Sequence, residues 1–220
     1  MPPAAARRGR LVYSAGLPDF PAPDMNPLAN AFASIACLLA CAVAAAPARA
    51  QAPALAPAAA ACPALLQHTF PRLQDDKPQP LCQYAGKVLL VVNTASYCGY
   101  TGQYEGLEAL HAKYAARGLV VMGFPSNDFN QEDADTGKIA DLCFNTYGVK
   151  FPMFAPGKVS GRDANALFAS LAQATGQPPK WNFHKYVVDR QGKPVAAFAS
   201  RVTPGDAALV AAIEKALAQP

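Results

Sequence analysis

The chain has 220 residues, of which 52% are hydrophobic and 15% are charged, and its formal net charge is +4. Its 19 Lys and Arg are nearly balanced by 15 Asp and Glu, and they are scattered rather than clustered, which argues against a nucleic-acid-binding protein. The length is sufficient for one domain with a proper core after removal of an N-terminal segment.

Ala and Pro dominate about the first 60 residues, and a Pro-rich segment of this kind does not form ordinary helix or sheet. Within it, the apolar run from Ala31 to Ala46 is shorter than the roughly 20 residues that a transmembrane helix needs. Ala48 and Ala50 follow with the small-x-small spacing of a signal-peptide cleavage site. The pattern therefore predicts export, with a mature chain that begins at Gln51.

We divide the chain into an export signal over 1–50, a disordered leader over 51–61 and a folded domain over 62–220. Residues 1–24 are interpreted as an over-extended start, because their arginines lie far from the apolar run. The predicted location is the periplasm, without stable membrane insertion after processing. In the alternative interpretation the protein is a lipoprotein anchored at Cys41, which ends a Leu-Leu-Ala-Cys sequence.

The domain begins with a predicted strand near Thr69–Leu73, the first strand of a hairpin. The next predicted strand, Val88–Val92, is an apolar run of the kind that is buried on both faces of a parallel or mixed sheet. Asn93–Ser96 break this pattern with small polar residues. A helix is predicted from about Thr101, which could cap it, to Arg117.

Cys98 thus follows a strand and precedes a helix. A helix N-terminus stabilises an anion, and the thiolate is the nucleophilic form of cysteine, so this position favours a reactive thiol. In the alternative interpretation, Cys98 is only a small buried apolar residue.

Gly118 ends the first helix, and Leu119–Phe124 is predicted to be a second buried strand, parallel to the first. The remaining predicted elements are two helices, two strands joined by a hairpin turn, and a final helix with Pro204 in its first turn: Lys138–Tyr147, Asn165–Thr175, Phe183–Asp189, Val195–Ala199 and Pro204–Leu217. The order β-β-α-β-α-α-β-β-α predicts an α/β protein with a thioredoxin-like fold, in which helices flank a central mixed sheet.

Four sequence blocks resemble the signatures of the glutathione peroxidase family. The blocks, in order, are Val92–Thr101 (VNTASYCGYT), Phe124–Asn127 (FPSN), Tyr147–Phe154 (YGVKFPMF) and Lys180–Phe183 (KWNF). The resemblance covers about Phe70 to the C-terminus. It implies the same thioredoxin-like fold and a thiol peroxidase of the cysteine-containing, exported bacterial type.

The resemblance also implies a set of uncharged donors around the Cys98 sulfur, namely Gln131, Trp181 and Asn182. A thiolate that attacks a peroxide needs donors that stabilise the sulfur anion and the leaving hydroxide. The loop departs from the family pattern, since Ser126 replaces a Cys, Asp128 replaces a Gln and one residue is missing before Gln131. Gln131 could instead be an exposed loop amide, and Trp181 a core aromatic residue.

Cys143 occupies the position of the resolving cysteine in family members that use thioredoxin. Its role would be to attack the Cys98 sulfenic acid and form a disulfide before further oxidation. Because bonded cysteines need Cα atoms within about 7 Å, the helix that carries Cys143 should unwind locally. In the alternative interpretation, Cys143 is a structural core residue.

With Cys62 and Cys82 included, the chain after the predicted signal has an even number of cysteines, as expected in an oxidising compartment. We predict a structural disulfide between them, rather than two buried free thiols. The histidines His68, His111 and His184 are isolated and lack metal-ligand spacing, so no metal and no cofactor are predicted.

The predicted function is reduction of hydrogen peroxide or organic hydroperoxides, with a thioredoxin-like protein or glutathione as reductant. The family's central insertion is absent, which predicts a monomer. A thiol–disulfide carrier is the first alternative, but Cys98-Gly-Tyr-Thr lacks the second cysteine of a Cys-x-x-Cys pair. A copper-delivery module is the second alternative, but it needs a further Cys or His ligand beside Cys98.

Overall fold

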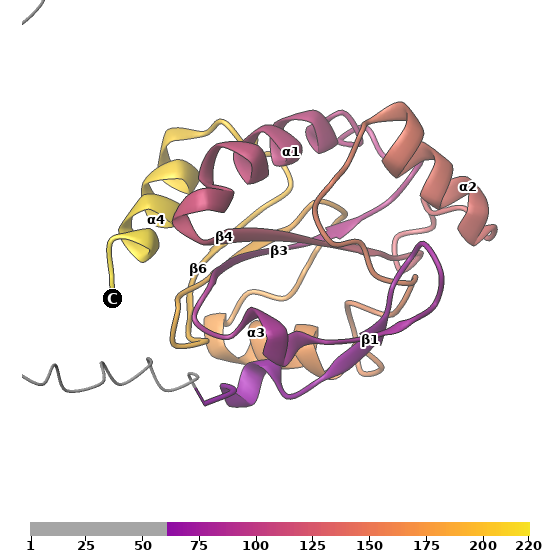
Figure 1. The fold of residues 1–220 in the computed structure, drawn as a ribbon. Helices are drawn as coiled ribbons and strands as arrows, with labels where there is room; N and C mark the ends of the chain where they lie inside the picture. The colour runs from indigo at the N-terminus through magenta and orange to yellow at the C-terminus, as the bar shows by residue number, and fades with distance from the viewer. Residues whose placement is uncertain (1–60) are drawn as a thin grey trace, which may run out of the picture. The chain divides into compact units, whose positions relative to one another are not determined.

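A four-stranded mixed sheet lies at the centre of the computed structural model, which describes residues 61–220 (Figure 1). The predicted signal peptide, the possible lipidation at Cys41 and the predicted leader up to residue 60 lie outside the described residues. The strands are β3 (Val88–Thr94), β4 (Leu119–Pro125), β5 (Lys185–Val188) and β6 (Pro194–Phe198). In the sheet order β4-β3-β5-β6, β3 and β4 are parallel and the other pairs are antiparallel, which confirms the predicted mixed sheet.

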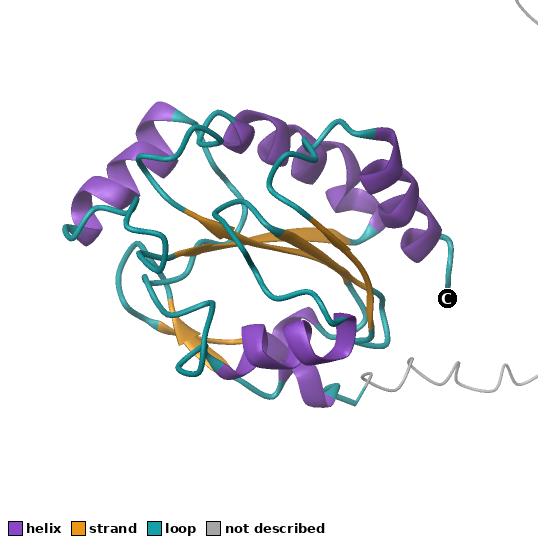
Figure 2. Cartoon of the chain, turned by 180° about the vertical axis from the view of Figure 1, so that it is seen from behind, coloured by secondary structure: helices purple, strands orange, loops and turns teal. Residues whose placement is uncertain are grey.

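Helices cover both faces of this sheet (Figures 1 and 2). The helices are α1 (Gln103–Tyr114), α2 (Thr136–Asp141), α3 (Ala166–Thr175) and α4 (Ala207–Leu217). Short 3₁₀ turns lie at Ala64–Leu66, Leu81–Tyr84 and Ala115–Arg117, and a π-helical turn at Leu142–Thr146 follows α2. This arrangement is the predicted thioredoxin-like fold.

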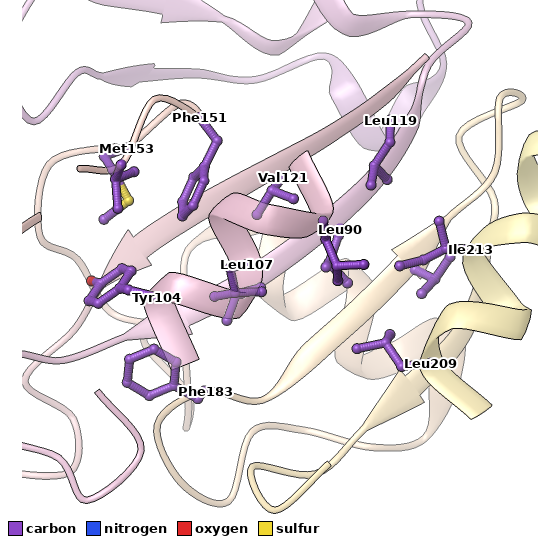
Figure 3. Close-up of a cluster of buried hydrophobic side chains, with 14 of the residues drawn as sticks. Leu90, Tyr104, Leu107, Leu119, Val121, Phe151, Met153, Phe183, Leu209 and Ile213 are labelled. Carbon is purple, nitrogen blue, oxygen red and sulfur yellow. The ribbon is translucent and has the colours of Figure 1, made fainter. Parts of the chain in front are cut away.

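Alternate residues of β3 build two separate cores, because successive side chains of a strand point to opposite faces. Leu90 packs in a cluster with residues of α1 and α4, including Leu107 and Ile213 (Figure 3). Val91 packs in a second cluster with Phe168 of α3. Every residue of β3 is buried, so the strand that leads to Cys98 is fixed from both sides.

The predicted strand near Thr69–Leu73 is β1 (Thr69–Pro71), and it forms a hairpin outside the main sheet with β2 (Pro78–Pro80), a strand that the sequence analysis did not predict. The predicted disulfide is also present: Cys62 and Cys82 are bonded, with Cα atoms 5.2 Å apart. The bond ties the start of the domain to the 3₁₀ turn at Leu81–Tyr84.

We expect that replacing both Cys62 and Cys82 with Ser lowers the free energy of unfolding by about 3 kcal/mol, since the bond closes a 20-residue loop in the unfolded chain. Peroxide turnover at 25 °C should persist, because neither sulfur lies among the proposed catalytic groups. Denaturant unfolding of the double variant and the parent, each assayed for activity, checks both statements. Equal unfolding midpoints with equal slopes would contradict the prediction.

Several predicted boundaries need correction. Strand β3 continues through Asn93 and Thr94, because both pair with β4. The N-cap of α1 is Gly102, and the hydroxyl of Thr101 instead accepts a hydrogen bond from the Cys98 N–H. Helix α4 begins after Asp206, whose side chain caps it, so Pro204 precedes the helix rather than occupying its first turn.

The predicted helix over Lys138–Tyr147 has two parts, because regular α-helix ends at Asp141 and the π-helical turn carries Cys143. No helix within residues 61–220 has the length and apolar character needed to cross a membrane.

Candidate active site

Cys98 lies in the loop between β3 and α1, and only 7% of it is exposed. The Tyr100 N–H donates a hydrogen bond to its sulfur at 3.4 Å. The Cys98 N–H donates to Thr101 Oγ1 at 3.1 Å, which fixes the loop. Since α1 begins only at Gln103, the nearest donor to the sulfur is this backbone N–H rather than the first turn of the helix. Such a donor stabilises a thiolate.

Gln131 and Asn182 lie side by side. The Asn182 side chain is fully buried, and its Nδ2 group donates to Gln131 Oε1 at 3.1 Å. The backbone carbonyl of Gln131 accepts from the Tyr97 N–H at 2.9 Å, so Gln131 also contacts the residue before Cys98. Three segments that are distant in sequence therefore meet here, and the Gln131 Nε2 group donates to no acceptor within the described domain.

The position of Asp128 supports the placement of Gln131 despite the shorter loop. Its carboxylate accepts hydrogen bonds from the Val159 and Ser160 N–H groups at 2.7 and 2.9 Å and pairs with Lys158 at 3.0 Å. The Asp128 carboxylate therefore holds the loop at residues 158–160. Gln131 is the loop amide that meets Asn182.

Trp181 is 41% exposed, and its ring lies against Phe129 with 5.5 Å between ring centroids. This exposure rules out the interpretation of Trp181 as a core aromatic residue. Together with Tyr100, it lines a cavity of about 530 Å³ whose other walls include His184, Lys180 and Arg201. Cys98, Gln131 and Asn182 are not among the residues that line this cavity, so of the predicted site residues only Trp181 faces it.

Cys143 lies on the π-helical turn and is fully buried, and its thiol donates to the Tyr104 hydroxyl at 3.4 Å. Burial raises the pKa of Cys143 from 9.0 to about 11, so the thiol is protonated at neutral pH. It belongs to the same hydrophobic cluster as Cys98, and the structure holds both as free thiols. Isolated π-helical turns occur often at functional sites.

Sequence reasoning did not identify Glu132, which lies beside Gln131 and is only 7% exposed. Its Oε1 atom accepts hydrogen bonds from the N–H groups of Ser96 and Asp133, and burial raises the pKa of its carboxyl group. Glu132 thus ties the loop of Gln131 to the loop of Cys98. The signal that could have found it is its place directly after a proposed donor, at the start of the acidic stretch Glu132–Asp135.

Sequence reasoning also missed Asn93 and Lys185, which hold the turn that carries Trp181 and Asn182. No group of three His, Cys, Asp or Glu within residues 61–220 could hold a metal ion.

Comparison with known proteins points to one family. A sequence profile described as glutathione peroxidase matches residues 67–172. The chain is 44% identical to the hydroperoxy fatty acid reductase gpx1 of Synechocystis, in an alignment of 154 positions that covers 65% of this chain and 90% of that protein. It is also 44% identical to the glutathione peroxidase-like peroxiredoxin GPX5 of Chlamydomonas reinhardtii, over 64% of this chain and 89% of that one.

Solved structures agree with this similarity. The crystal structure of Trgpx in its apo form has a TM-score of 0.58 and 32% sequence identity, covering 71% of this chain and 97% of that one. A thioredoxin-family thiol:disulfide interchange protein from Chlorobium tepidum has a TM-score of 0.55 at 14% identity, covering 68% and 92% of the two chains. The second likeness shows that the fold is thioredoxin-like.

Proposed function

Because the chain belongs to the glutathione peroxidase family and is a peroxidase, we propose that Cys98 is its peroxidatic residue. The Cys98 thiolate attacks one oxygen of the peroxide, an S–O bond forms and the O–O bond breaks. The other oxygen leaves as water or an alcohol after taking up a proton. The sulfur, oxidised by two electrons, becomes a sulfenic acid.

The contact between Asn182 and Gln131, beside the Cys98 loop, is the observation that carries this proposal. The bond fixes the orientation of both amides and leaves the Gln131 Nε2 group available to a substrate oxygen. The half-exposed indole of Trp181 supplies a second uncharged N–H donor in this proposal. Uncharged donors that are fixed in advance stabilise the charge on the leaving oxygen at every working pH.

Replacing Gln131 or Trp181 with Ala should slow the peroxide step by about 10- to 1,000-fold, as expected for loss of an oxyanion-type donor. Alkylation of Cys98 by iodoacetamide should change little, because it involves no leaving oxygen. Stopped-flow mixing of the reduced protein with hydrogen peroxide, followed by quench and intact-mass analysis, measures the step. A matched control is Gln191→Ala, since Gln191 lies on the turn between β5 and β6 and its amide donates to the Pro220 carbonyl. Parent-like rates in both donor variants would contradict the assignment.

Cys143 is the proposed resolving residue. Its thiolate attacks the Cys98 sulfenic sulfur, hydroxide leaves and takes up a proton, and a disulfide forms. The location on a π-helical turn supports this role, because such a turn interrupts the regular helical hydrogen bonding. A thioredoxin-like protein or glutathione then supplies the two electrons that restore both thiols, and the protein works as a monomer.

Hydrogen peroxide and organic hydroperoxides are the proposed substrates. The relative from Synechocystis is named for its action on hydroperoxy fatty acids, which supports the organic class. No contact among the described residues of the site favours the alternative, which is a thiol–disulfide carrier without peroxidase turnover. It predicts that one equivalent of peroxide leaves the mass of the protein unchanged, whereas the proposed cycle removes two hydrogens as a Cys98–Cys143 disulfide forms.

The proposed location is the periplasm, in a role in oxidative stress, and the lipoprotein anchored at Cys41 is the alternative. The Cys62–Cys82 disulfide supports export, since structural disulfides persist in oxidising compartments. N-terminal sequencing of the exported protein should begin at Gln51. If residues 1–50 were still present in the exported protein, the proposed cleavage would be wrong. A lipid-modified Cys41 would establish the alternative.

A further inference from the structure

The turn that carries Trp181 and Asn182 is held in an unfavourable backbone conformation. Phe183, the last residue of this turn, has a φ of +61°, a value that residues with side chains rarely adopt. Its ring is buried against Tyr104 of α1, with 5.4 Å between centroids (Figure 3). Such a conformation persists only when the surroundings over-determine it, so the contacts that hold the turn decide where its two side chains point.

Asn93 provides most of these contacts. Its Nδ2 group donates to the Trp181 carbonyl at 3.2 Å, and its Oδ1 atom accepts from the His184 N–H at 3.0 Å. Its backbone carbonyl accepts from the Phe183 N–H at 2.6 Å. One fully buried asparagine thus binds the beginning, the end and the following residue of the turn.

The same strand, β3, carries Asn93 and leads directly to Cys98. The nucleophile and the turn that carries Trp181 and Asn182 therefore share one support. Removing the Asn93 side chain breaks two hydrogen bonds between this strand and the turn, and so frees the distance between the sulfur and the turn to change. The arrangement is suited to setting that distance.

Lys185 makes a further contact with the turn. Its Nζ group donates to the Phe183 carbonyl at 2.6 Å, and the side chain is fully buried. No carboxylate forms an ion pair with it among residues 61–220. A buried, unpaired amine is unfavourable for stability, and burial lowers its pKa to about 7. A residue that costs stability in this way is consistent with a functional demand on the carbonyl it contacts.

We propose that Asn93 is a positioning residue for peroxide reduction, and that Lys185 assists it by fixing the Phe183 carbonyl. The inference rests on the proposed function, in which Trp181 and Asn182 assist Cys98. Neither residue touches the peroxide. Both act by holding the Trp181–Asn182 turn at the distance from the sulfur that the reaction needs.

The first test is Asn93→Ala in the full chain, with Asn165→Ala as matched control. Asn165 also uses both ends of its amide, since it caps α3 through the Phe168 N–H and donates to the Lys158 carbonyl. We expect Asn93→Ala to slow Cys98 oxidation by hydrogen peroxide about 10- to 100-fold, as for a small misplacement of catalytic groups. Iodoacetamide alkylation of Cys98 should stay within about twofold of the parent rate, because it depends on the thiolate alone.

Fluorescence gives a second readout, because Trp181 is the only tryptophan of the chain. Asn93→Ala should shift its emission maximum and change its quenching by iodide, whereas Asn165→Ala should leave both as in the parent. A parent-like emission spectrum together with a parent-like peroxide rate would overturn the proposal. A loss of stability equal to that of Asn165→Ala, with no change in rate, would show that Asn93 is only structural.

A double-mutant cycle separates this inference from the proposed function. If Asn93 acts through the turn, Asn93→Ala should slow oxidation only slightly in a Trp181→Phe, Asn182→Ala background, so the effects should be non-additive. Fully additive effects would overturn the positioning role while leaving the donors in place. If the background variant itself keeps the parent rate, the proposed donor function fails instead, and the positioning role fails with it.

Lys185→Met keeps the proposal testable if Asn93→Ala does not fold. Methionine has a similar length and no charge, and replacing a buried charge with an apolar side chain is often neutral or stabilising. We expect a melting temperature at or above that of the parent and a several-fold slower peroxide step. A parent-like rate in this variant would remove Lys185 from the proposal.

Discussion

We expect Cys98→Ser to abolish peroxide reduction, with the rate of the first oxidation lowered by at least about 1,000-fold. A serine hydroxyl is not ionised near neutral pH and is a poor nucleophile towards a peroxide oxygen. The side chains have nearly the same shape, and only 7% of Cys98 is exposed, so the fold should be retained. The change therefore removes the chemistry and little else.

The measurement is the oxidation rate after rapid mixing of reduced protein with hydrogen peroxide, read by intact mass. The variant retains Cys143, so any oxygen added to that thiol is distinguished by peptide mapping. Unchanged Trp181 emission serves as the control that the site is still assembled. A residual rate above about a tenth of the parent value, mapped to a residue other than Cys98, would contradict the assignment.

Cys143→Ser should give the opposite pattern. The first oxidation should proceed at the parent rate, since Cys98 and its proposed donors remain. The turnover rate with thioredoxin should then fall by a similar factor, about 1,000-fold, because no internal disulfide forms. Sulfenic Cys98 should accumulate and be oxidised further to the sulfinic acid when peroxide is in excess. Dimedone labelling, read by mass, measures the sulfenic form.

In the parent protein, the pH dependence of disulfide formation distinguishes two ways in which Cys143 could reach Cys98. Burial raises the pKa of Cys143 to about 11 in the folded state, whereas the exposed thiol has a value of 9.0. If α2 and its π-helical turn unwind first, the rate of disulfide formation should rise with pH and level off above about 9. If the attack comes from the buried position, the rate should keep rising to about pH 11. Normal thioredoxin-dependent turnover by Cys143→Ser would instead show that Cys143 is not the resolving residue.

Local sequence patterns predicted most elements correctly, since they depend on neighbours in the chain. The apolar run at Val88–Val92 predicted β3, and Gly118 correctly ended the first helical segment with its φ of +100°. The prediction failed at Thr101, whose hydroxyl accepts from the Cys98 N–H, and at Pro204, which lies before the actual cap Asp206. A cap signal states only that a residue could begin a helix, and hydrogen bonds with neighbouring residues decide which position does.

The site shows the same division. The blocks around Cys98, Gln131 and Trp181 predict which residues surround the sulfur, but not that Asn182 donates to Gln131 or that Trp181 is half-exposed. Such contacts join loops that follow different strands. Their geometry depends on how the sheet brings the strand ends together.

By itself, the sequence predicted the thioredoxin-like fold and the family, because periodicity and motif spacing are local properties. The even number of cysteines favoured a Cys62–Cys82 disulfide over two free thiols, and the structure decided between them. Only the tertiary structure decided the burial of Cys143 and Lys185 and the role of Asn93 in holding residues 181–184. Asn93 and His184 are 91 positions apart in the chain, and their hydrogen bond exists because β5 pairs with β3. The alternating pattern of the sequence predicts that Lys185 lies in a strand. Only the packing around the folded sheet explains why its amine is buried away from water.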